Sequence, residues 1–125
     1  MNRSPAHQKW PDHKIVERHL QQRVQVFVAG ELIADSSSVI QVDEDGSPAR
    51  YYFPRSDVNG DKLIRTPKTT VCPFKGTAHY FSVNAGGARF DDVVWTYEDP
   101  YEEHAGLQDR LAFWNEQSPA IQIKL

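Results

Sequence analysis

The chain has 125 residues, a net charge of −3 and a charged fraction of 25%, values that fit one soluble globular domain. A slightly acidic chain lacks the basic stripe that nucleic-acid polymers and anionic membranes need, so we expect neither as a partner. No apolar run approaches the roughly 20 residues that cross a bilayer, and the N-terminal residues lack the apolar segment of a secretory signal.

Cys72 is the only cysteine of the chain. A disulfide within the chain is therefore excluded, and so is a zinc site built on several thiolates. A lone free thiol is typical of a reducing compartment, so the sequence predicts a cytoplasmic protein. It predicts no metal site and assigns no cofactor.

Residues 1–12 are mostly polar, contain Pro5 and Pro11, and carry a single aromatic side chain, Trp10. This composition predicts a flexible N-terminal arm that docks through Trp10. We predict that residues 13–125 form one domain.

The first strand of the predicted domain lies where Val24, Val26 and Val28 recur at every second position. Ala29-Gly30-Glu31 then turns the chain, and residues 32–34 continue as the second arm of a hairpin. Strands joined without helices pair in antiparallel fashion, because a parallel crossover needs a dozen or more residues. Further short strands are expected at residues 39–42, 51–53, 63–65 (ending near Pro67), 79–83, 93–97 and 121–125, the last as an edge strand.

One helix is expected near the C-terminus, at residues 100–114. Asp99 and Pro100 fit the N-cap and the first position of a helix. Leu107 and Leu111 follow four residues apart and would share one face of that helix. The fold class predicted from the sequence is therefore mainly β, a single compact domain of twisted antiparallel sheets with one C-terminal helix.

Short motifs in a fixed order give the chain a family resemblance: YYFP at 51–54, TVCPFKGTA at 70–78, VWTYEDP at 94–100 and LAFW at 111–114. By their order and spacing, the chain resembles the domain-of-unknown-function 427 family from about residue 13 to residue 114. That family is also catalogued under a nucleotidyltransferase-like name. The resemblance implies a Mss4-like β fold and no established reaction. Other proteins of that fold hold zinc on paired cysteines, which this chain lacks, so the metal does not carry over.

The strongest candidate for a working site is the segment TTVCPFKG at residues 69–76. Pro73 fixes the backbone after Cys72, and Gly76 permits a sharp turn or the close approach of a ligand. Lys75 lies three residues after Cys72, so if the loop curls its ammonium could sit near the sulfur and favour a nucleophilic thiolate, or it could bind an anion. The alternatives are a cysteine buried beneath the turn and a lysine paired with a carboxylate.

His79 follows the same segment and could act as a general base for Cys72. The catalytic candidates are therefore Cys72, Lys75 and His79. The alternative for His79 is a strand histidine that faces solvent or is satisfied by a neighbour.

Aromatic side chains cluster in the same motifs. Alternation places Trp95 and Tyr97 on one face of their strand, and it places Tyr80 and Phe81 on opposite faces of theirs. Rings with one lysine suit a small planar or anionic ligand, although large rings also build the cores of small β domains. The ligand-binding residues that we predict are Tyr51, Tyr52, Lys75, Gly76, Tyr80, Trp95 and Tyr97.

Three functions remain open from the sequence. The first is binding of a small planar or anionic molecule, with a nucleotide among the candidates, in an aromatic cleft with Lys75. The second is an enzyme, either nucleotidyltransferase-like or using Cys72, Lys75 and His79. The third is a structural or interaction protein whose strand at residues 121–125 pairs with another copy to form a homo-oligomer.

Overall fold

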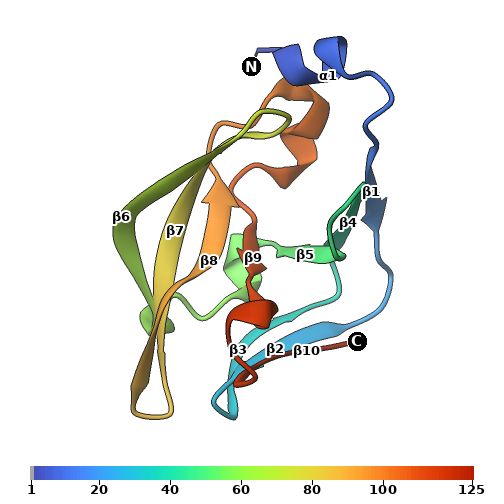
Figure 1. Ribbon diagram of the computed structural model, residues 1–125. Helices are drawn as coiled ribbons and strands as arrows, with labels where there is room; N and C mark the ends of the chain where they lie inside the picture. The colour runs from blue at the N-terminus through green and yellow to red at the C-terminus, as the bar shows by residue number, and fades with distance from the viewer. Residues whose placement is uncertain (1) are drawn as a thin grey trace.

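The computed structural model describes residues 2–125, and its strands form two antiparallel sheets (Figure 1). The seven-stranded sheet has the order β1-β4-β5-β9-β8-β7-β6, and the three-stranded sheet has the order β10-β2-β3. The prediction of a mainly β fold is confirmed. The strands are β1 (Ile15–His19), β2 (Val24–Val28), β3 (Glu31–Ser36), β4 (Ile40–Glu44), β5 (Arg50–Phe53), β6 (Leu63–Cys72), β7 (Gly76–Ala85), β8 (Ala88–Tyr97), β9 (Leu111–Phe113) and β10 (Ile121–Lys124).

The main core lies between the two sheets. Phe53 of β5 and Phe113 of β9 meet edge to face there, with ring centroids 5.8 Å apart and planes at 88°. Val26 and Ile33 of the three-stranded sheet belong to the same apolar cluster, and both are buried. The predicted edge strand at residues 121–125 is confirmed as β10, whose Ile121 joins this cluster.

The other face of the seven-stranded sheet carries a second apolar cluster, which includes Tyr52, Tyr80, Trp95 and Tyr97. The period-2 alternation of strands produces this division, because neighbouring side chains point to opposite faces. The sequence predicted that Tyr80 and Phe81 lie on opposite faces of their strand. The structure confirms this, because Phe81 lies in the inter-sheet core and Tyr80 lies in the second cluster. In Figure 1 the long strands β6, β7 and β8 stand on one side of β9, and the short strands β4 and β5 on the other.

The predicted hairpin at residues 24–34 is confirmed as β2 and β3. Its turn has positive φ at Ala29 (48°) and Gly30 (80°). Two successive residues of positive φ are typical of the tight turns that match the twist of antiparallel strands.

The predicted C-terminal helix at residues 100–114 differs from the structure in its type and in its length. Residues Glu102–Leu107 form a 3₁₀ helix, η3, which is broken by non-helical angles at His104 and has no side-chain cap at its N-cap residue, Tyr101. Asp109, at a φ of 60°, then redirects the chain into β9. β9 is a central strand buried on both faces, so its side chains form a continuous apolar run that a helical spacing also fits.

β6 is longer than the sequence predicted, since it continues past Pro67 to Cys72. A register shift between Arg65 and Thr69 takes the proline out of regular pairing with β7. β6 is also an edge strand, where a missing N–H costs little. Two further 3₁₀ turns, η1 (Arg55–Asp57) and η2 (Gly60–Lys62), precede β6, and η4 (Asn115–Gln117) precedes β10.

The predicted N-terminal arm, residues 1–12, begins with Met1, which lies outside the described residues. The rest of this segment includes a short helix, α1 (Pro5–Lys9), that packs on the end of the domain (Figure 1). Its N-cap residue Ser4 donates from Oγ to the carbonyl of Pro73 (3.0 Å) and from its backbone N–H to Glu103 (2.9 Å), and Nε2 of His7 lies 2.8 Å from Nε2 of His104. Trp10, the predicted docking residue, lies with its ring centroid 6.3 Å from that of Phe74 but is 49% exposed, whereas Ser4 is fully buried. Among residues 2–125, no helix has the length and apolar character needed to cross a membrane.

We expect that Ser4→Ala loosens α1 without unfolding the domain. Ser4 is fully buried, caps the helix by accepting from the His7 N–H (3.4 Å), and supplies the bond to Pro73. Loss of such a cap costs about 1 kcal/mol, so hydrogen exchange of the Trp10 amide, which bonds to the Ala6 carbonyl, should be roughly fivefold faster. Ser37→Ala, at an exposed serine, is the control. Unchanged exchange at Trp10 in the Ser4 variant would contradict the docking role.

Candidate functional site

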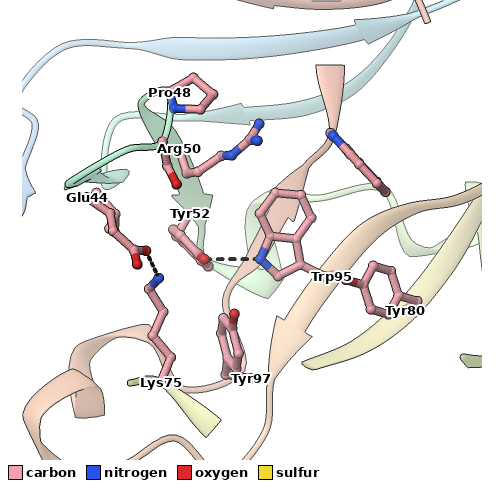
Figure 2. A pocket seen from close by; sticks show the side chains of 11 residues that line it. Glu44, Pro48, Arg50, Tyr52, Lys75, Tyr80, Trp95 and Tyr97 are labelled. Atoms are coloured by element: carbon pink, nitrogen blue, oxygen red, sulfur yellow. Dashed lines mark hydrogen bonds and ion pairs between the residues drawn. The ribbon is translucent and has the colours of Figure 1, made fainter. Parts of the chain in front are cut away.

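A cleft of about 230 Å³ opens on the aromatic face of the seven-stranded sheet (Figure 2). One wall comes from β4, β5 and the loop between them, and the other comes from β7, β8 and the loop before β7. The residues that line it are Val42, Glu44, Ser47, Pro48, Arg50, Tyr52, Lys75, Tyr80, Trp95, Tyr97 and Trp114.

The floor of the cleft is a row of directly paired residues across four neighbouring strands. Tyr52 pairs with Ala112, Ala112 with Trp95, and Trp95 with Tyr80. Because the methyl group of Ala112 is short, Tyr52 and Trp95 meet above it. The indole Nε1–H of Trp95 donates to the Tyr52 hydroxyl at 3.0 Å.

Lys75 reaches the cleft from a tight turn, because the pair Cys72 and Gly76 closes the β6–β7 hairpin around it. Gly76 has a φ of +120°, and a Cβ there would lie 3.3 Å from the Asp99 carbonyl oxygen. Only glycine adopts this conformation without strain. The hairpin therefore directs the Lys75 side chain inward, where the residue is 6% exposed.

The ammonium of Lys75 is paired with Glu44 of β4, with Nζ and Oε1 2.5 Å apart. The other oxygen of Glu44 lies 2.9 Å from Nε2 of His13. Burial by itself would raise the pKa of the Glu44 carboxyl, but hydrogen bonds from Lys75 and His13 outweigh it and hold the pKa below its ordinary value. Glu44 is therefore a carboxylate at neutral pH, with both oxygens already engaged.

The hydroxyl of Tyr97 also borders the cleft. Tyr97 is 6% exposed, and no group among residues 2–125 hydrogen-bonds to its hydroxyl, which unlike the buried Thr96 Oγ1 keeps some access to solvent. Burial raises the pKa of both the Tyr97 and the Tyr52 phenols well above the ordinary value, so both stay protonated in the physiological range. Figure 2 shows the ends of Tyr52, Tyr97 and Lys75 turned towards the same part of the cleft.

Cations border the aromatic rings at the mouth of the cleft. The guanidinium of Arg50 lies 5.4 Å from the ring centroid of Trp95 and forms an ion pair with Glu116 (2.6 Å). The ammonium of Lys68 lies 5.0 Å from the Tyr80 ring and 5.8 Å from the Trp114 ring. These are distances at which a cation is attracted to an aromatic face.

The structure brings together most of the predicted ligand-binding residues. Tyr52, Lys75, Tyr80, Trp95 and Tyr97 all line the cleft. The other two do not. Tyr51 packs against the inter-sheet core on the opposite face, and Gly76 shapes the turn without lining the cleft.

The predicted catalytic residues are not assembled as one group. Cys72 is partly buried against the aromatic cluster, on the same side of the sheet as Tyr80. His79 pairs with Thr69 and Thr96, so it lies on the other face and approaches Glu98 at 3.6 Å. The arrangement gives no support to His79 as a base for Cys72. The alternative in which Lys75 is paired with a carboxylate is the one that the structure shows.

Several lining residues were missed from the sequence, chiefly Glu44, Arg50 and Trp114. Alternation could have identified two of them, because Arg50 shares a face with Tyr52, and Glu44 shares a face with Val42. Trp114 was assigned to a helix and not to the end of a strand. Among residues 2–125, His, Cys, Asp and Glu side chains form no group of three or more that could hold a metal ion.

Comparison with known families agrees with the motif resemblance. The family model described as a domain of unknown function (DUF427) matches residues 17–123. None of the curated proteins compared with the chain matches it. The Mss4-like arrangement that the resemblance implies stays a prediction. Since the matched segment covers most of the chain, the protein belongs to the domain-of-unknown-function 427 family.

Proposed function

We propose that the protein is a cytoplasmic small-molecule-binding module whose ligand lies in the cleft above Trp95 and Tyr97. The observation that carries this proposal is the Tyr97 hydroxyl, which borders the cleft, keeps slight access to solvent and has no hydrogen-bond partner among residues 2–125. A ligand acceptor at this position would give the hydroxyl a hydrogen bond worth about 0.5–1.5 kcal/mol. The compartment is proposed from the free thiol of Cys72.

The rest of the cleft supports the same proposal. Binding sites for small molecules are concave, lined mainly by apolar and aromatic side chains, and supplied with a few convergent polar groups. Trp95, Trp114 and Tyr80 provide the rings, and Lys75 and Tyr97 provide the polar groups. Lys75 is held by Glu44, so its position is fixed before any ligand arrives.

The cleft volume limits the size of the ligand. At about 230 Å³ it is smaller than the roughly 300–1,000 Å³ of pockets that enclose drug-sized molecules. We therefore propose a ligand with little more than one or two rings inside the cleft.

A thermal-shift screen with a library of small metabolites tests the proposal. A ligand at 100 times its Kd stabilises the folded state by about 2.7 kcal/mol, which raises Tm by several degrees. Trp114→Ala removes a ring from the mouth of the cleft and should abolish the shift. Trp10→Ala removes an exposed ring outside the cleft and should leave the shift unchanged.

The Trp95 indole N–H gives a second, local readout by NMR. A ligand that binds as proposed should shift the Trp95 signal and leave the Trp10 signal in place. A screen in which no compound shifts Trp95, or in which the Trp114 variant responds like the wild type, would contradict the proposal.

A further inference from the structure

We infer that the ligand class is a small planar carboxylate, an aromatic or conjugated monoacid whose oxygens meet Tyr52, Tyr97 and Lys75. This inference rests on the proposed function, since it concerns the same cleft. It goes further by choosing an oxyanion over a neutral molecule and a one-ring acid over a nucleotide.

The hydrogen-bonding groups of the cleft favour an anionic ligand. The Tyr97 O–H has no partner among the described residues, and the Tyr52 hydroxyl accepts from Trp95 while its own proton stays available. Lys75 uses one N–H on Glu44 and has others to offer. Glu44, the one carboxylate that lines the cleft, already accepts on both oxygens. Lys75 and the two phenols thus offer free donors, while the carboxylate in the lining has both oxygens engaged, and this combination suits an oxyanion.

The charged residues in and beside the cleft favour the same kind of ligand. Lys75 and Glu44 compensate each other inside the cleft. Arg50 also lines the cleft, but its partner Glu116 does not, and the Glu116 side chain is 44% exposed. Lys68 adds a further cation beside the Tyr80 and Trp114 rings. Among the lining residues the cations Arg50 and Lys75 outnumber the carboxylate Glu44, which favours an anionic over a cationic ligand.

The shape of the cleft favours a small planar ligand. The rings of Trp95, Tyr80 and Trp114 offer flat apolar surfaces next to these donors, which suits a planar body attached to the anionic group. A nucleotide carries a base, a sugar and phosphates, which is more than a volume of about 230 Å³ encloses. A single ring or a short conjugated chain with one carboxylate matches both the volume and the polarity.

The test is a calorimetric titration of the full chain with matched acids and amides. Benzoate and cinnamate are the anionic probes, benzamide and cinnamamide are their neutral isosteres, and AMP represents the nucleotides. We expect at least one acid to bind at least tenfold more tightly than its amide and than AMP. Tyr97→Phe should weaken that acid roughly tenfold to a hundredfold, as expected for losing a hydrogen bond to a charged group. Tyr51→Phe, which removes a hydroxyl on the opposite face, should change nothing.

The outcomes separate this inference from the proposed function. An amide that binds as tightly as its acid, AMP binding more tightly than either acid, or a Tyr97→Phe variant with wild-type affinity for the acid would each overturn the carboxylate. The cleft would remain a binding site if those ligands still shifted the Trp95 indole signal. If none of the probes binds, the carboxylate inference fails, and only the wider metabolite screen decides the proposed function.

Discussion

Replacing Phe53 with alanine should lower the free energy of unfolding by about 3–5 kcal/mol, the range found for large aromatic side chains in well-packed cores. Phe53 is fully buried and meets Phe113 edge to face between the two sheets. The variant loses the transfer free energy of the ring and leaves a cavity that the paired strands β5 and β9 cannot close by shifting. Urea unfolding measures the effect as a lower midpoint at an unchanged slope.

Two further variants show whether position or residue type decides the result. Phe53→Leu keeps most of the buried volume and should cost far less than the alanine variant. Leu32→Ala, on β3 where the side chain is 43% exposed, should change the free energy of unfolding by less than about 1 kcal/mol. A Phe53→Ala variant as stable as the Leu32 variant would show that the two sheets do not share one packed core.

The alternation of side chains made much of this architecture predictable. In β8 it separates Val94, which packs between the sheets, from Trp95, which faces the cleft. In β7 it separates Phe81 from Tyr80 in the same way. The sequence thus indicated which rings could border a site, because a one-residue step along a strand is enough to change the face.

The misplaced helix has a physical explanation in β9. A strand buried on both faces needs no alternation, and Leu111-Ala112-Phe113 has none. An apolar run of this length fits a buried strand and one side of a helix equally well. Its position between β5 and β8 depends on pairing with strands that are distant in sequence, which a local pattern does not contain.

The partners of Lys75 in the site were unpredictable for a related reason. Lys75 and Glu44 are separated by 31 residues, and His13, on the far side of Glu44, comes from the segment after α1. Lys75 was a candidate because Pro73 and Gly76 frame it, but Glu44 and His13 alone look like ordinary surface residues. Only the curvature of one sheet, which brings β4 opposite the β6–β7 turn, turns them into a buried group with fixed partners.

The buried ion pair of Lys75 and Glu44 predicts a second large effect on stability. Lys75→Met should lower the free energy of unfolding by about 3 kcal/mol at pH 7, because removing one partner of a buried ion pair leaves the other charge uncompensated. Lys75 is 6% exposed, and the Glu44 side chain is 18% exposed. Lys62→Met is a matched control: Lys62 pairs with Glu31 at 3.2 Å, but both side chains are well exposed, so its loss should cost 1 kcal/mol or less.

The cost of Lys75→Met should also depend on pH, with a definite sign. The folded-state pKa of Glu44 lies below its ordinary value, so its contribution to stability is complete above that ordinary value and is lost as the pH falls through the folded pKa. In the variant, burial is no longer offset by Lys75, and the pKa of Glu44 should rise. The difference in free energy of unfolding between wild type and variant should therefore shrink as the pH is lowered from 7 towards 3.

The double variant Lys75→Met with Glu44→Gln separates the ion pair from simple packing. If the cost comes from an unpaired carboxylate, the double variant should regain most of the stability that Lys75→Met loses, with a coupling free energy of 1 kcal/mol or more. If the two substitutions simply add, or if the loss in Lys75→Met is the same at pH 7 and pH 3, then Lys75 contributes through its aliphatic stem. In that case Glu44 does not hold the Lys75 ammonium in place for a ligand. The proposal that the polar groups of the cleft are positioned before a ligand binds would then be contradicted.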